Sequence, residues 1–258
     1  GIPIVPHYLS GIILNQGDRI MIDKMVGKTE VALYGLAYSI GMLVQLFISG
    51  MNSALTPWMY SKIKKGDIRS MRKVLQLLSV VVVGIAVALM LISPELVLIF
   101  GSPKYREAVY VIPPVAASVF FVFIYNILSM PQFYYEKTQF LMAASMAAAG
   151  ANVVLNFIFI RLFGYIAAGY TTLACYMLYS VGHYIVSKRI LVNEEIQENL
   201  MSPGFLVACS VFLIGASIIC NLIFPYRILR YAILLASAGL VFWKKELLLK
   251  TMADIRKK

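Results

Sequence analysis

The chain has 258 residues, of which 60% are hydrophobic and only 14% are charged, and its mean hydropathy is +0.81. A soluble domain carries about 25% charged residues, so this composition excludes an ordinary soluble protein and predicts a polytopic membrane protein. The net charge of +11 favours basic loops at the membrane border over a nucleic-acid partner.

The three cysteines, Cys175, Cys209 and Cys220, all lie in apolar stretches. Their number is odd and their spacing matches no metal site, so we expect embedded thiols, no disulfide framework, no metal and no cofactor. The first apolar stretch is too long and too polar for a cleavable signal. Because the chain begins with Gly1 instead of Met, we expect it to be part of a longer protein.

Apolar segments follow one another along most of the chain, and each is near or above the ~20 residues that cross the hydrocarbon core. Eight can be drawn, at 4–24, 31–60, 73–100, 109–135, 138–163, 165–187, 204–224 and 228–249. The last two contain few polar residues and follow a polar linker that carries three glutamates. We therefore predict an all-α membrane bundle in three parts: a six-helix lobe (1–187), a linker (188–203), and two further helices with a basic tail (204–258).

The segment Pro6–Ile22, PHYLSGIILNQGDRIMI, carries polar residues where lipid would demand apolar ones. At about 100° per residue, four side chains fall within one arc of roughly 120°: His7, Asn15, Asp18 and Arg19. A charge in hydrocarbon costs several kcal/mol, so this stripe predicts a protein interior or a hydrated cavity. The simpler alternative is an Asp18–Arg19 pair that reaches water at a helix end, although adjacent helical residues are poorly placed to pair.

Other predicted helices repeat this pattern of a polar stripe. The stripes are Tyr34, Tyr38, Gln45, Ser49 and Asn52 in 31–60; Asn152 and Asn156 in 138–163; and Thr172, Tyr176, Tyr179 and His183 in 165–187. Hydrogen bonds between helices explain any single stripe. Several stripes in the first six helices together favour a shared hydrated cavity, and the prolines in 31–60, 73–100 and 109–135 supply bends that a rocking bundle can use.

The basic residues predict the orientation of the helices. Fifteen of the 23 Lys and Arg residues fall on the side that holds both termini, seven fall on the other side, and Arg19 alone lies inside a segment. Because Lys and Arg are enriched in cytoplasmic loops, we predict that both termini are cytoplasmic.

Several short motifs, in order and spacing, resemble the second half of lipid-linked oligosaccharide flippases. These are the exporters for O-antigen, capsule and exopolysaccharide synthesis, in the superfamily that includes the multidrug and toxin extruders. The resemblance covers residues 1 to about 187 and rests on Pro6-His7, Asp18 to Ile22, Leu33 to Gly41, Pro57-Trp58, Tyr105 with Ala108, Lys137-Thr138, Asn152, Asn156, Gly164, Ala167-Ala168-Gly169 and Thr171-Thr172.

The resemblance implies one six-helix lobe of a two-lobe transporter in the cytoplasmic membrane of a bacterium or archaeon. The other lobe, or a second copy of the chain, would cover the cavity face. The implied substrate is an undecaprenyl-pyrophosphate-linked oligosaccharide, moved by alternating access that H⁺ or Na⁺ drives. We expect Arg19 to bind the pyrophosphate or an acidic sugar, and Asp18 and His7 to hold Arg19 or carry a coupling proton. Hydrogen bonds to sugar hydroxyls would come from Tyr38, Gln45, Asn52, Asn152 and Asn156, and Asn15 completes the expected substrate-binding set.

Three alternatives stay open at this point. A multidrug antiporter needs an apolar or acidic cavity, and the neighbouring Arg19 argues against it. A membrane-embedded enzyme needs clustered acids or histidines, whereas the chain has two histidines, His7 and His183, and we predict no catalytic residue. An accessory membrane subunit without transport of its own is the third.

Overall fold

A computed structural model describes residues 4–243; the side chains of 4–11, 13–15, 238 and 240–243 lie outside this description. The described part contains helices and connecting turns and no strand. The elements are α1 (Ile4–Met25), α2 (Lys28–Gly41), α3 (Leu43–Lys64), α4 (Ile68–Phe100), the 3₁₀ helix η1 (Pro103–Val111), α5 (Ile112–Tyr134), α6 (Gln139–Phe163), α7 (Ala167–Asn193), α8 (Pro203–Ile223) and α9 (Arg227–Trp243).

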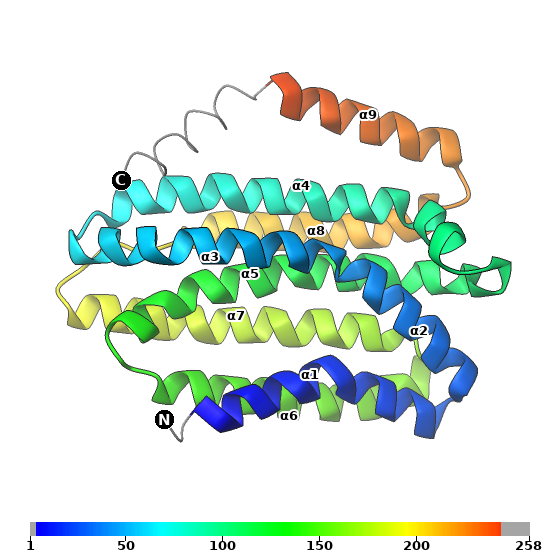
Figure 1. Ribbon diagram of the computed structural model, residues 1–258, viewed down its shortest axis with the longest axis horizontal. Coiled ribbons are helices and arrows are strands. Elements are labelled where there is room, and N and C mark those ends of the chain that lie inside the picture. The colour runs from blue at the N-terminus through cyan, green and yellow to red at the C-terminus, as the bar shows by residue number, and fades with distance from the viewer. Residues whose placement is uncertain (1–3, 244–258) are drawn as a thin grey trace.

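The predicted segment 31–60 is two helices, because the chain breaks at Met42. A Cβ on Gly41 would lie 2.6 Å from Cγ1 of Val115, so only glycine lets α2 approach α5 this closely. The helices α2 and α3 therefore run in different directions (Figure 1). Farther along the chain, α7 continues to Asn193, into the stretch expected to be linker. Residues 244–249 of the last expected segment lie outside the described residues.

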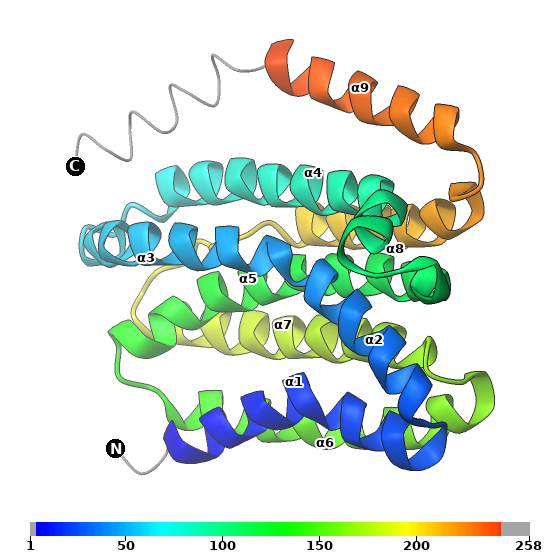
Figure 2. The same ribbon diagram turned by 45° about the vertical axis from the view of Figure 1, so that its right-hand side comes forward.

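The helix α5 lies in the centre of the bundle, where α3, α4, α7 and α8 pack around it (Figures 1 and 2). In the most apolar stretch of Pro103–Tyr134, which contains α5, 89% of the residues are buried. In the corresponding stretch of α8 the share is 22%. The pair α1–α6 lies beyond α7, and α4 lies on the opposite side of α5. This layering brings α1 against both α2 and α6, and α6 against α7.

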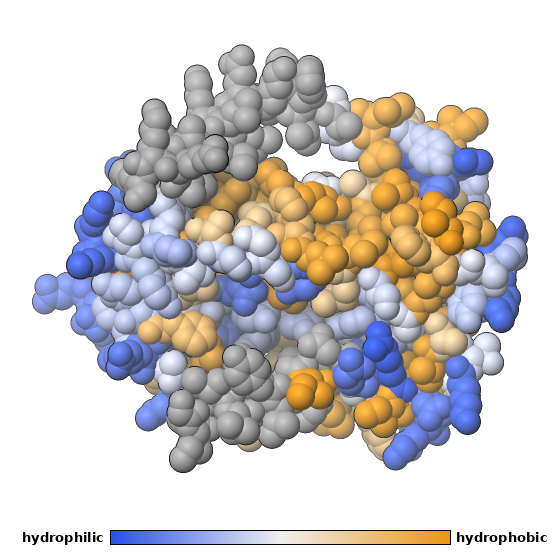
Figure 3. Space-filling model, in the orientation of Figure 1, coloured by the Kyte–Doolittle hydropathy of each residue, from blue (hydrophilic) through white to orange (hydrophobic). Residues whose placement is uncertain are grey.

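The predicted fold class is confirmed. Within 4–243, five helical stretches are long and apolar enough to cross a membrane. Figure 3 shows hydrophilic residues at the two ends of the long axis and an apolar band between them over α4. An apolar girdle between polar ends is the surface that a membrane-spanning bundle requires.

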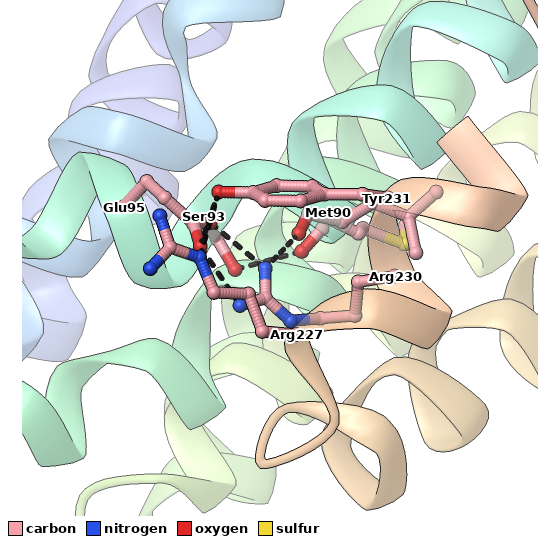
Figure 4. A network of polar contacts seen from close by, with 7 residues as sticks. Met90, Ser93, Glu95, Arg227, Arg230 and Tyr231 are labelled. Carbon is pink, nitrogen blue, oxygen red and sulfur yellow. Dashed lines mark hydrogen bonds and ion pairs between the residues drawn. The ribbon is translucent and has the colours of Figure 1, made fainter. Parts of the chain in front are cut away.

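The helix α9 is attached to the bundle by a buried ion pair. Nη1 and Nη2 of Arg230 each lie 2.8 Å from a carboxylate oxygen of Glu95 in α4 (Figure 4). Nη1 also donates to the carbonyl of Leu91 at 2.6 Å, beside the helix turn that Pro94 interrupts. Tyr231 adds a hydrogen bond to Glu95 at 3.0 Å. Glu95 is thus fully paired by residues of α9, a helix that makes few other contacts with the bundle.

Candidate functional site

The carboxylate of Asp18 is the meeting point of four helices. Its side chain has no exposed surface. Oδ2 accepts hydrogen bonds from the hydroxyls of Tyr34 in α2, at 2.5 Å, and Thr172 in α7, at 2.8 Å. Oδ1 accepts from the side-chain amide of Asn156 in α6, also at 2.5 Å. These bonds join α1, α2, α6 and α7 through one acidic group, and we call the four residues the Asp18 cluster.

A second layer of hydrogen bonds orients Asn156. Its amide nitrogen also donates to Oδ1 of Asn152, one turn earlier in α6, at 3.1 Å. Its carbonyl oxygen accepts from the hydroxyl of Thr171. Because the oxygen is occupied by a donor, the amide nitrogen must face Asp18, and the second layer fixes the polarity of the cluster.

Within the described part of the chain, no cation compensates the Asp18 carboxylate. Among the described residues, no Lys, Arg or His nitrogen lies within 4 Å of it; the ion pairs there are Lys62–Asp67 and Arg230–Glu95. A buried carboxylate that meets only neutral donors can be neutralised by taking up a proton or a small cation. The arrangement is therefore chemically suited to bind H⁺ or an alkali cation.

Of the two roles expected for Asp18, the structure does not show the one of holding Arg19, because the two side chains have different partners. Nη1 of Arg19 donates to Oε1 of Gln16 at 2.9 Å. The guanidinium carbon lies 5.3 Å from the ring centre of Tyr38, within the range of a cation–π contact. Arg19 is partly exposed, and its buried Nε has no hydrogen-bond partner. Its charge is left for something other than Asp18.

Aromatic side chains extend from the Asp18 cluster along α7. The rings of Tyr34 and Tyr38 lie 5.8 Å apart, and Tyr125 stacks on Tyr176 at 6.3 Å. One turn farther along α7, Tyr179 contacts Tyr125 at 4.6 Å. Beyond it, Tyr179 meets the ring of His183 at 4.5 Å, and Nδ1 of His183 lies 2.7 Å from Nε2 of Gln132. The predicted stripe of α7 therefore faces the protein interior.

The structure brings together only part of the predicted site. Asp18, Asn152 and Asn156 are fully buried and in contact, and Tyr38 lies beside Arg19. The other two described candidates, Gln45 and Asn52, lie on α3, whose main neighbours are α4 and α5. Oε1 of Gln45 is buried without a hydrogen-bond partner. The side chains of His7 and Asn15 lie outside the described residues.

Sequence reasoning did not assign three hydrogen-bonding residues to this site: Tyr34, Thr171 and Thr172. Tyr34 and Thr172 had been recognised as members of polar stripes, which was the available signal. The face between α3 and α1 is hollowed and carries hydrophilic residues in its middle (Figure 3). This hollow agrees with the expectation that polar stripes of the first helices border a common space.

Comparisons with known proteins bear on this arrangement. Residues 3–158 match the family described as MatE. The chain is 29% identical over 154 residues to "Lsg locus putative protein 1" of Haemophilus influenzae, covering 57% of this chain and 37% of that protein. It is 31% identical over 147 residues to an "Uncharacterized membrane protein" of the same organism, covering 54% and 35%. The match thus spans little more than a third of each relative's length. No solved structure matches the chain.

Proposed function

Because the chain belongs to the MatE family of membrane transporters, we propose that it forms one lobe of a transporter that flips an undecaprenyl-pyrophosphate-linked oligosaccharide across the cytoplasmic membrane. The observation that carries this proposal is the divergence of Asp18 and Arg19. The acid is sealed among neutral donors, whereas the guanidinium is partly exposed and has no acidic partner among the described residues. One helix turn thus offers an anion site and a separate cation site.

In this account Arg19 binds the pyrophosphate or an acidic sugar of the substrate. A guanidinium binds phosphate oxygens through two parallel hydrogen bonds, and the Tyr38 ring holds it from one side. Asp18 takes up the coupling H⁺ or Na⁺. Since its ligands come from four helices, gain or loss of that cation changes how these helices are held together, as alternating access requires.

The proposal also requires a partner surface. The matched stretch covers only 37% and 35% of the relatives' length. We propose that a second lobe, or a second copy of this chain, covers the face that bears Arg19. Both termini would then be cytoplasmic, as the distribution of Lys and Arg predicts.

The test is polymer export by cells that carry Arg19 variants. Arg19→Ala should reduce export at least about tenfold, because a charge-assisted contact is worth at least about 1.5 kcal/mol. Arg19→Lys keeps the charge but loses the two-pronged geometry and should retain part of the export. Lys24→Ala removes an exposed charge near the end of the same helix and serves as the control. Wild-type export by Arg19→Ala, at equal membrane abundance, would refute the anion site.

One observation favours a second candidate, a multidrug antiporter of the same family. Arg19 argued against it only while Asp18 and Arg19 were expected to act together, and the structure separates them. A buried acid near several tyrosine rings also suits a cationic, aromatic substrate. A drug antiporter predicts that Asp18→Asn sensitises cells to cationic drugs and that Arg19→Ala does not. The flippase predicts loss of polymer export in both variants.

A further inference from the structure

An apolar groove runs between α7 and α8, on the far side of α7 from α6. It has a volume of about 180 Å³, and its lining includes Phe121, Ile124, Met177, Val181, Leu206 and Val207. The two serines in its wall, Ser180 and Ser210, already donate to backbone carbonyls at 2.9 and 2.7 Å. The groove therefore offers its occupant an apolar surface.

A second hollow, of about 450 Å³, lies on the last turns of α7. Its lining combines Lys188, Arg189 and Asn193 with Ile185 and Val192. Both basic side chains are exposed, and neither forms an ion pair within the described part of the chain. No carboxylate is among the residues that line it. This hollow is suited to an anion at the border between apolar and polar surroundings.

Tyr184 lines both the groove and the hollow, so the two adjoin at this side chain. Its hydroxyl is buried and has no hydrogen-bond partner. The groove is open on its outer side, since Val181 and Val207 on its two walls are 56% and 62% exposed. An apolar groove beside two basic side chains is complementary to an anionic lipid, whose acyl chain is apolar and whose headgroup is negatively charged.

We propose that this composite surface binds an anionic phospholipid of the adjacent leaflet, with one acyl chain in the α7–α8 groove and the phosphate on Lys188 and Arg189. The open side of the groove favours bulk phospholipid over the transported substrate, which must reach the face that bears Arg19. Basic pockets at the ends of transmembrane helices bind anionic headgroups in this way. The bound lipid would also hold α8, which is poorly buried by the protein itself, against the lobe.

The test measures lipid binding to the purified native protein by mass spectrometry under non-denaturing conditions. Phosphatidylglycerol and phosphatidylethanolamine with identical acyl chains differ in headgroup charge, so comparing them isolates the contribution of that charge to binding. Inorganic phosphate tests the contribution of the phosphate alone. We expect phosphatidylglycerol to bind at least about tenfold more tightly than either. The double variant Lys188→Gln/Arg189→Gln should lose about thirtyfold in that affinity, as expected for two charges near a lipid surface at about 1 kcal/mol each.

Two further variants separate the parts of this site. Val207→Trp fills the groove and should weaken both phospholipids equally. Lys64→Gln/Lys65→Gln removes two exposed charges at the same end of the bundle, away from the groove, and should leave binding unchanged. Equal loss in the Lys64/Lys65 control, equal affinity for the two phospholipids, or tighter binding of undecaprenyl phosphate than of phosphatidylglycerol would each overturn the assignment. Because none of these outcomes depends on transport, the test is independent of the proposed function.

Discussion

Asp18 and Glu95 are two acids held inside the same helix bundle, and the chain treats them differently. Glu95 accepts hydrogen bonds from a bidentate arginine and a tyrosine hydroxyl, and both donors come from α9. Asp18 receives three neutral donors from three different helices and no cation among the described residues. A paired acid joins two elements permanently, whereas an unpaired acid that several helices share can respond to a proton or an ion. The comparison separates an anchor from a candidate switch.

The largest effect on stability should come from breaking the anchor. Arg230→Ala leaves Glu95 without its cation inside the bundle and should cost about 3 kcal/mol of unfolding free energy, the lower end for a buried pair because Glu95 is 25% exposed. Chemical unfolding in detergent measures this. Arg227→Ala removes an exposed arginine that bonds Tyr231 at 3.3 Å and makes no ion pair with Glu95, and it should cost less than about 1 kcal/mol.

The double variant Glu95→Leu/Arg230→Met sharpens that test. If the pair is only an anchor, replacing both charges by apolar side chains should restore most of the stability lost in Arg230→Ala. A double variant as unstable as Arg230→Ala would contradict the description of this pair as an anchor that apolar contacts can replace.

Smaller losses should follow from removing single donors of the Asp18 cluster. Tyr34→Phe and Thr172→Val each remove one hydrogen bond to a charged acceptor, for which about 1.5–3 kcal/mol is typical. Thermal unfolding of each variant checks this, with Tyr110→Phe, a partly exposed tyrosine packed on Phe224, as the control. The combined variant should lose less than the sum, because both donors share Oδ2. Full additivity would show that the cluster does not act as a unit.

The smallest effect concerns a third acid, at the border of the bundle. The ion pair with Lys62, at 2.5 Å, and then the bond from Ser70 hold the pKa of Asp67 at about 2. A depressed carboxyl pKa contributes stability that is fully present above the unfolded pKa of about 4 and is lost as the pH falls through 2. Asp67→Asn should therefore lower stability slightly at pH 6 and not at pH 2, by less than about 1 kcal/mol because the side chain is 36% exposed. An equal effect at both pH values would exclude this cause.

The sequence predicted the elements better than their meeting points. The apolar segments and the polar positions follow from hydropathy and helical period, which are local properties, so the stripes containing Asp18, Asn156 and Thr172 were found. The convergence of these residues was not, because Asn156 and Thr172 lie 138 and 154 positions from Asp18 and their registers depend on tertiary packing. The break at Met42 depends likewise on the approach of Gly41 to α5.

The same limit explains why the anchor was missed. Arg230 follows a polar turn, so its neighbours in the sequence indicate a loop charge, and it was counted as one in predicting orientation. Its partner Glu95 lies 135 positions away in α4, and Arg230 is only 3% exposed. A charged side chain at a helix end can be stabilised by solvent or by a partner distant in the sequence. The local sequence does not distinguish between the two.

The central claim is that Asp18 serves transport beyond its part in holding four helices together, and Asp18→Asn tests it most directly. Asparagine keeps the size and one acceptor oxygen, so Tyr34 and Thr172 retain a partner. Its amide nitrogen then faces the amide nitrogen of Asn156, so that hydrogen bond is lost, and asparagine binds no proton. Export or drug extrusion and unfolding free energy should be measured on the same variant. The account predicts that transport falls at least about tenfold while the unfolding free energy falls by no more than about 3 kcal/mol, the upper value for one hydrogen bond to a charged group. Wild-type transport, or a loss of transport that only follows a loss of folded protein, would contradict it.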